Sequence, residues 1–181
     1  MSKLIKQAML GDQEAFIRLM DENKPAMLRI AYGFFHQEAD IADAIQETIL
    51  DAYEHLFSLK EPRYFKTWLM RILINNCNNI YRKNKKYLPM EELPEKSSDI
   101  MQDMDEGLLR FKELLSCVSE KNRVCFQLYY GEELTTREIA QILHIRESTI
   151  RSQMHREKLK LKDQFLSDHY GNRTGKEGKQ A

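Results

Sequence analysis

Apolar residues recur every three or four positions along most of the chain, which is the period of an amphipathic α-helix. This period predicts helices over residues 38–57 and 63–86, and three or four shorter ones within residues 108–162. Glycine (7) and proline (4) are scarce among the 181 residues, which disfavours a sheet protein. In the first of these helices, the apolar face is made by Ile41, Ile45, Ile49, Ala52 and Leu56. The sequence therefore predicts an all-α protein.

The pattern is interrupted once, at residues 88–107, which carry two of the four prolines, a serine pair and a run of acids. Such a composition is typical of an extended linker. We therefore expect two small helical domains, residues 1–87 and 108–169, joined by an acidic flexible linker. Residues 170–181 are rich in glycine and lysine and are expected to be a disordered tail.

Charge is segregated along the chain, although the formal net charge is zero, from 28 basic and 28 acidic residues. Residues 38–54 hold six acids and no lysine or arginine, and residues 91–106 have a net charge of −6. Residues 60–86 have a net charge of +7, and residues 147–162 a net charge of +3. Because nucleic-acid binding depends on the local footprint of charge, the neutral sum excludes nothing.

The acids of the first predicted helix fall within an arc of roughly 80° at about 100° per residue. A stripe of one sign weakens the helix through like-charge neighbours and repels DNA. An ordinary solvated face, the alternative, would usually mix both signs. The stripe consists of Asp40, Asp43, Glu47, Asp51 and Glu54, with the apolar Leu50 beside it. This pattern favours a basic protein partner.

One face of the helix predicted over residues 63–86 combines aromatic rings, guanidinium groups and amides. Rings stack on unpaired bases, amides bond base edges, and Arg and Lys hold phosphates, so this mixture is typical of single-stranded nucleic-acid binding. The alternative is that Trp68 belongs to the core and the lysines form a solvated helix end. The face contains Tyr64, Thr67, Trp68, Arg71, Asn75, Asn78 and Arg82.

The stretch TTREIAQILHIRESTIRSQMHREKLKLK predicts two helices and a tight turn. Thr135 and Glu138 have the spacing of a capping box, and His144 stands at the turn. In the last helix Ile150 and Met154 point inward. The outward positions are Ser148, Arg151, Ser152, His155 and Arg156. Short polar residues followed by basic ones fit a DNA major groove, whereas a plain helical hairpin with a basic end is the alternative.

With these elements in place, the chain resembles the extracytoplasmic-function (ECF) sigma factors of bacterial RNA polymerase, the minimal members of the sigma-70 family. AFIRLMDENKPAMLRIAYGFFHQEADIADAIQETILDAYEHL is similar to regions 2.1 and 2.2, and FKTWLMRILINNCNNIYRK to regions 2.3 and 2.4. LTTREIAQILHIRESTIRSQMHREKLKLK is similar to region 4.2. The resemblance covers nearly the whole chain.

The resemblance implies a role for each face. Asp43, Gln46, Glu47 and Leu50 would bind the clamp helices of the polymerase β′ subunit, and region 4 would meet the β flap. The −10 element would be melted and read by Tyr64, Trp68, Arg71, Asn75 and Arg82, with the FSLKEP loop receiving a flipped base. The −35 duplex would be read by Ser148, Thr149, Arg151, Ser152, His155 and Arg156. Family members are commonly held inactive by an anti-sigma factor, often anchored in the membrane.

The sequence argues against other classes of protein. A helix-turn-helix regulator that works without core polymerase would leave the acid stripe unexplained. It would also need a ligand pocket or metal constellation within residues 1–87, and the sequence shows none. Without a Gly-rich phosphate loop, a nucleophile motif or metal-ligand spacing, we expect no enzyme, no cofactor, no metal and no small-molecule substrate.

Location and redox state follow from two further features. No apolar run reaches the roughly 18 residues that span a bilayer, and the N-terminus lacks a signal peptide, so we expect a cytoplasmic protein. Cys77, Cys117 and Cys125 have no ligand spacing and are expected to be buried, reduced thiols.

Overall fold

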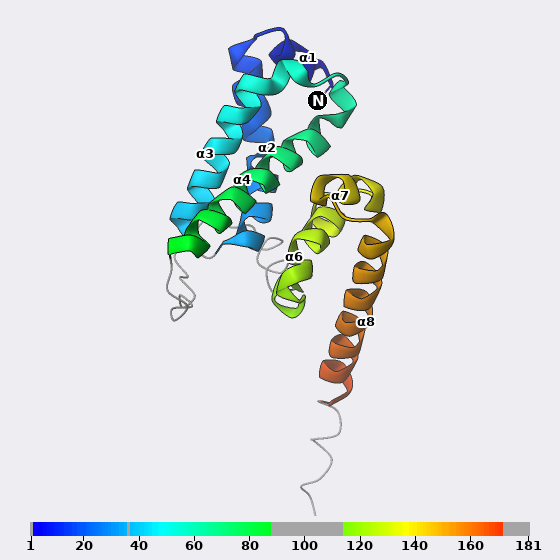
Figure 1. The fold of residues 1–181 in the computed structure, drawn as a ribbon. Helices are drawn as coiled ribbons and strands as arrows, with labels where there is room; N and C mark the ends of the chain where they lie inside the picture. Colours follow the sequence, from blue (N-terminus) through cyan, green and yellow to red (C-terminus); the bar gives the residue numbers. More distant parts are fainter. Residues whose placement is uncertain (1, 36, 88–113, 172–181) are drawn as a thin grey trace, which may run out of the picture.

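The computed structural model describes residues 2–35, 37–87 and 114–171, and every regular element within them is a helix (Figure 1). The first domain contains α1 (Ser2–Met9), α2 (Gln13–Phe34), α3 (Glu38–His55) and α4 (Phe65–Tyr87). Two short 3₁₀ turns, Leu56–Ser58 and Pro62–Tyr64, connect α3 to α4. The second domain contains α6 (Glu120–Phe126), the π-helical turn η4 (Gln127–Gly131), α7 (Thr136–Leu143) and α8 (Glu147–Gly171). The predicted all-α fold is confirmed, whereas the predicted linker lies outside the described residues.

In the first domain α2, α3 and α4 pack side by side, and α1 lies across one end (Figure 1). The side-chain carboxylate of Asp12 accepts a hydrogen bond from the Ala15 amide at 3.0 Å and so begins α2. The core is apolar and close-packed. Its fully buried members include Leu19, Met27, Ile30, Leu69 and Leu73.

The second domain is a helix-turn-helix unit with α6 behind it. The predicted capping box is confirmed, because Thr135 and Glu138 satisfy each other's backbone amides at the start of α7. His144 ends α7 in the left-handed conformation, with φ 54° and ψ 39°, and this turn aims α8 away from α7. Leu128, Ile139 and Ile150 are fully buried beneath the turn.

The two domains touch each other directly. α7 packs on α4 (Figure 1), while η4 and α6 pack on α2. A Cβ added at Gly33 of α2 would lie 2.2 Å from Oε1 of Gln127 in η4, so a larger residue would force the Gln127 side chain to move. The Gln127 side-chain amide donates to the Arg29 carbonyl oxygen at 2.6 Å, which fixes the contact.

Candidate polymerase- and DNA-binding surfaces

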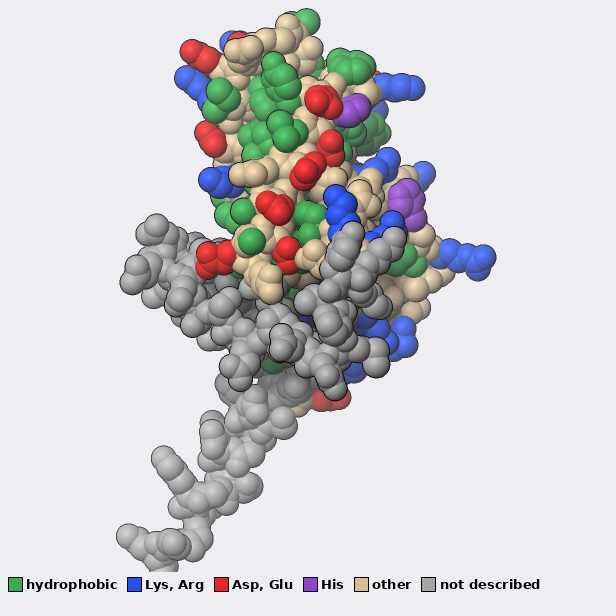
Figure 2. Space-filling model, turned by 60° about the vertical axis from the view of Figure 1, so that its left-hand side comes forward, with side chains coloured by type: hydrophobic (Ala, Val, Ile, Leu, Met, Phe, Trp, Pro, Cys, Tyr) green, Lys and Arg blue, Asp and Glu red, His purple; other side chains and the backbone are tan. Residues whose placement is uncertain are grey.

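The outer face of α3 carries acids along an otherwise partly apolar surface (Figure 2). Asp43, Gln46, Glu47 and Leu50 are all exposed there, and Leu50 is 60% exposed. The carboxylates of Asp43 and Glu47 make no hydrogen bond or ion pair with any residue that the structure describes. These four residues, called the α3 face below, therefore present two carboxylates and an exposed apolar side chain to solvent.

Two other acids of the predicted stripe have partners on α4. The Asn84 side-chain amide donates to Asp40 Oδ1 at 2.9 Å, and the Asn76 amide donates to Asp51 Oδ2 at 2.8 Å. These bonds tie α3 to α4, and both acids are half-buried. The stripe seen in the sequence is thus divided between structural acids and exposed ones.

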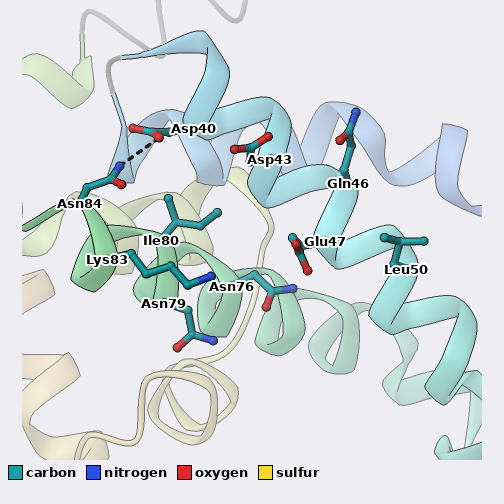
Figure 3. Close-up of a pocket in the computed structure, with 10 residues that line it drawn as sticks. All are labelled: Asp40, Asp43, Gln46, Glu47, Leu50, Asn76, Asn79, Ile80, Lys83 and Asn84. Carbon is teal, nitrogen blue, oxygen red and sulfur yellow. Dashed lines mark hydrogen bonds between the residues drawn. The ribbon is translucent and has the colours of Figure 1, made fainter. Parts of the chain in front are cut away.

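A polar groove of about 340 Å³ runs between the two helices (Figure 3). The α3 face forms one wall together with Asp40, and α4 forms the other. The α4 wall consists of Asn76, Asn79, Ile80, Lys83 and Asn84. Carboxylates beside amides, next to exposed apolar surface, form an environment suited to Arg or Lys side chains of a protein partner.

The residues predicted to contact the −10 element lie along α4 and the turn before it. Tyr64 is 50% exposed, and the Arg63 guanidinium stacks over its ring at 4.8 Å from the centroid. Asn75 and Arg82 are exposed. Asn75 and Arg82 lie on α4, whereas Tyr64 lies in the turn that precedes it.

Trp68 and Arg71 are half-buried rather than free on that face. The Trp68 ring packs against the core, with its centroid 5.9 Å from that of Phe65. Nε of Arg71 is buried and has no hydrogen-bond partner among the described residues. The core alternative for Trp68 is therefore confirmed in part, because the ring supports the fold, whereas its contact with DNA stays a prediction.

Thr67 was expected on the same exposed face, and that expectation is wrong. Its side chain is covered by the second domain, which leaves the residue 8% exposed. The hydroxyl donates to Glu138 Oε1 of α7 at 3.1 Å. The sequence held no signal for this burial, because the contact joins residues 71 positions apart.

The outward face of α8 has the predicted composition. Ile150 and Met154 are buried, as expected. Ser148, Arg151, Ser152, His155 and Arg156 are exposed, and Thr149 is half-buried at the edge. Glu147 Oε1 holds the Arg151 guanidinium at 2.6 Å, and the same oxygen accepts from the Thr136 hydroxyl at 2.8 Å. Hydrogen bonds from Thr136 and Arg151 lower the pKa of Glu147, so this carboxylate is ionised at neutral pH.

Glu157, which sequence reasoning did not single out, anchors α8 inside the second domain. Its Oε1 accepts from the Ser119 hydroxyl at 2.6 Å and from the Asn122 amide at 2.7 Å. Burial alone raises the pKa of Glu157, but the hydrogen bonds from Ser119 and Asn122 outweigh burial, so the pKa lies below its ordinary value. Ser119 stands at the N-cap of α6 but makes no side-chain capping bond there, because its hydroxyl donates to Glu157.

The cysteines divide into two classes. Cys77 and Cys125 are buried as expected, and burial raises the pKa of their thiols to about 12 and about 11. Cys117 is exposed, so the expectation was wrong there. Across the described residues no three His, Cys, Asp or Glu side chains gather as potential metal ligands, and no helix has the length and apolarity needed to cross a membrane.

Comparison with known proteins agrees with this geometry. The chain matches the family models for Sigma-70 region 2 over residues 19–87 and Sigma-70, region 4 over residues 108–161. It is 32% identical over 181 residues to the ECF RNA polymerase sigma factor SigW of Bacillus subtilis, covering 90% of this chain and 95% of that protein. It is 23% identical to the RNA polymerase sigma-E factor of Streptomyces coelicolor, covering 87% of this chain and 90% of that protein.

Two solved structures share the fold, each with a TM-score of 0.65. One is CnrH in complex with the cytosolic domain of CnrY, at 23% identity over 92% of this chain and 97% of that chain. The other is the sigma factor RpoE in complex with the anti-sigma factor NepR from Bartonella quintana, at 21% identity over 84% of this chain and 98% of that chain. Both region models match in order, and SigW is 32% identical over 90% of this chain. The chain therefore belongs to the ECF group of the sigma-70 family and is an alternative sigma factor that directs transcription initiation.

Proposed function

We propose that the α3 face, made by Asp43, Gln46, Glu47 and Leu50, is the surface by which this sigma factor binds the clamp helices of the polymerase β′ subunit. The main support is that the carboxylates of Asp43 and Glu47 make no hydrogen bond or ion pair with any described residue. The neighbouring Asp40 and Asp51, by contrast, accept hydrogen bonds from α4. An unpaired acid beside an exposed leucine gains a charge-assisted hydrogen bond and apolar burial when a basic helix docks.

DNA recognition is divided between the two domains in this proposal. Residues 1–87 serve as region 2, and α4 reads and opens the −10 element through Tyr64, Trp68, Arg71, Asn75 and Arg82. Residues 108–169 serve as region 4, which meets the β flap. There α8 reads the −35 duplex through Ser148, Thr149, Arg151, Ser152, His155 and Arg156. Most of these side chains are exposed, with Trp68, Arg71 and Thr149 half-buried, and their mixture of basic, aromatic and short polar groups supports the division.

The chain would supply promoter recognition only, and the core enzyme would catalyse RNA synthesis. The protein would then work in the cytoplasm. Because the related sigma factor RpoE was solved with an anti-sigma factor, NepR, we propose that an anti-sigma factor also controls this chain. A membrane-anchored form of that partner would hold the sigma factor at the membrane until a signal releases it.

Binding to core polymerase tests the first assignment. Glu47→Lys should abolish retention of core enzyme on the immobilised protein, because a lysine would face the basic partner. Asp163→Lys makes the same charge change at an exposed site of α8 and should retain core enzyme normally. If Glu47→Lys and Asp163→Lys bind core enzyme equally at moderate salt, the α3 face is not the docking surface.

Strand opening tests the assignment of α4. Sequencing the transcripts made with core polymerase would first locate a promoter. On that promoter, Trp68→Ala should reduce permanganate reactivity of the −10 thymines more than it reduces formation of the closed complex. An equal loss of both, together with a lower melting temperature of the protein, would make Trp68 a residue of the core alone.

A further inference from the structure

A buried carboxylate held by two cations joins the two domains. Glu132, directly after η4, is 3% exposed. Its Oε1 accepts from Nη2 and Nε of Arg29 on α2, at 2.7 and 3.0 Å. Its Oε2 lies 3.2 Å from Nζ of Lys66 on α4, and that ammonium also donates to the Glu132 carbonyl oxygen at 2.8 Å. All of these partners belong to the first domain.

The backbone around Glu132 is shaped for this contact. The next residue, Glu133, has a positive φ of 56°, which turns the chain sharply after the buried carboxylate. Glu133 itself is exposed. Two adjacent glutamates thus point in opposite directions, and only Glu132 enters the interface. Two further contacts flank the ion pairs, the Gln127 bond to α2 and the Thr67 bond to α7.

The contact occupies the part of α4 that is proposed to meet DNA. Lys66 and Thr67 lie between Tyr64 and Trp68, and Thr67 is buried by α7. Arg71 of the same face keeps its Nε buried. A strand of DNA could not follow this face from Tyr64 to Arg71 while α7 remains docked on it.

The two cations that hold Glu132 suit a phosphate equally well. An arginine and a lysine converging on one carboxylate offer the donor geometry and the charge that bind the nucleic-acid backbone. When the domains separate, this cation pair loses its carboxylate and becomes available on the same side of the first domain as the proposed −10 surface.

We propose that Glu132 is an autoinhibitory latch: it holds the second domain on α2 and α4, and it occupies an Arg29–Lys66 site that binds backbone phosphate of single-stranded DNA once the domains separate. This proposal rests on the proposed role of α4 in binding DNA. The domain contact itself is independent of polymerase, so the latch can be tested on the full chain alone.

The test combines small-angle X-ray scattering with binding to a fluorescein-labelled, mixed-sequence, single-stranded DNA 20-mer. Glu132→Gln should increase the radius of gyration and tighten DNA binding by about five- to tenfold, because the docked state no longer competes with DNA. Glu133→Gln removes the same charge one residue away and should change neither quantity. Arg29→Ala should also expand the molecule, but with a smaller gain in DNA affinity than Glu132→Gln, because half of the phosphate site is lost.

Each outcome decides the matter. An unchanged radius of gyration in Glu132→Gln overturns the latch. Expansion with DNA binding no tighter than in Glu133→Gln overturns the masked phosphate site. If circular dichroism shows that Glu132→Gln is unfolded, Arg29→Ala decides instead, since it removes the α2 side chain that donates twice to Glu132; an unchanged radius of gyration in that variant overturns the latch. Failure of the wild-type chain to bind core polymerase would count against the proposed function and leave these readouts intact.

Discussion

The two domains differ in what stabilises each of them internally. Three helices of 18 to 23 residues enclose the core of the first domain, where Leu19, Met27, Leu69 and Leu73 are fully buried. The second domain is built on α6 and α7, of 7 and 8 residues, and attaches its long helix α8 partly through the buried carboxylate of Glu157. A small helical unit buries too little apolar surface to be stabilised by that surface alone, so polar contacts matter more in the second domain.

Carboxylates therefore serve opposite purposes in different parts of the molecule. Asp43 and Glu47 of the first domain face solvent, where a partner can reach them. Glu132 and Glu157 of the second domain are buried and bonded. Counting acids along the sequence treats these side chains alike, although only the exposed pair is available for recognition.

Removing apolar volume from the first domain should have the largest effect on stability. Leu73→Ala leaves a cavity in a fully buried position and should lower the free energy of unfolding by about 2–5 kcal/mol. Leu159→Ala, at an exposed position of α8, should change it by less than about 0.5 kcal/mol. Urea denaturation followed by circular dichroism measures the free energy of unfolding of both variants. Similar losses in the two would contradict the described core of the first domain.

Removing the carboxylate that anchors α8 should have the next largest effect. Glu157→Ala leaves the Ser119 hydroxyl and the Asn122 amide buried without their acceptor, which should destabilise the second domain by about 1–3 kcal/mol. Asp163→Ala, at an exposed position of the same helix, is the matched control. Amide hydrogen exchange would localise the loss to α6 and α8, and equal exchange in both variants would show that the anchor is dispensable.

Helical periodicity was sufficient to predict the fold, because it reports which side of each helix is buried. It placed Ile150 and Met154 inside and the serines and arginines of α8 outside, as the structure has them. The capping box of α7 was equally readable, since both partners lie within one turn. Local patterns of this kind survive in the sequence because their contacts span few residues.

Contacts between distant segments could not be predicted in the same way. Periodicity shows Thr67 on the polar side of α4 but not that α7 covers it. It gives no sign that Glu132 meets two cations of the first domain. The division of the acid stripe was hidden for the same reason, since Asp40 and Asp51 bond to amides 44 and 25 residues away.

Acid should weaken the second domain in a defined direction. Glu138 is partly desolvated, which raises its pKa, but hydrogen bonds from Thr135 and Thr67 hold the pKa below its ordinary value of 4.5; Glu157 is shifted the same way. A carboxylate with a depressed pKa stabilises the fold above its unfolded pKa, and that stability is lost as the pH falls through the folded value. Unfolding free energy should therefore be level near neutral pH and fall below about pH 4.5.

The matched variant isolates this effect. Glu157→Gln removes one of the two groups, so its curve of unfolding free energy against pH should fall less steeply than the wild-type curve in the acid range. The same curve measured for Asp163→Asn should follow the wild type. Parallel curves for wild type and Glu157→Gln would mean that Glu157 does not contribute to the acid sensitivity.

The smallest effect on stability should come from the residue with one of the clearest proposed roles. Arg151 is 69% exposed in its side chain and pairs with Glu147 one turn away, and exposed pairs of this kind contribute only about 0.3–0.5 kcal/mol. Arg151→Ala should therefore leave the melting curve nearly unchanged, yet it removes a guanidinium from the outward face of α8 and should weaken binding to a −35 duplex by at least about fivefold at fixed salt.

Lys121→Ala, at an exposed site of α6, controls for loss of charge. Fluorescence anisotropy separates the outcomes: equal weakening in the two variants would reduce Arg151 to a general contribution to charge, whereas loss in Arg151→Ala alone, without loss of stability, would show that a residue of little importance to the fold reads the DNA.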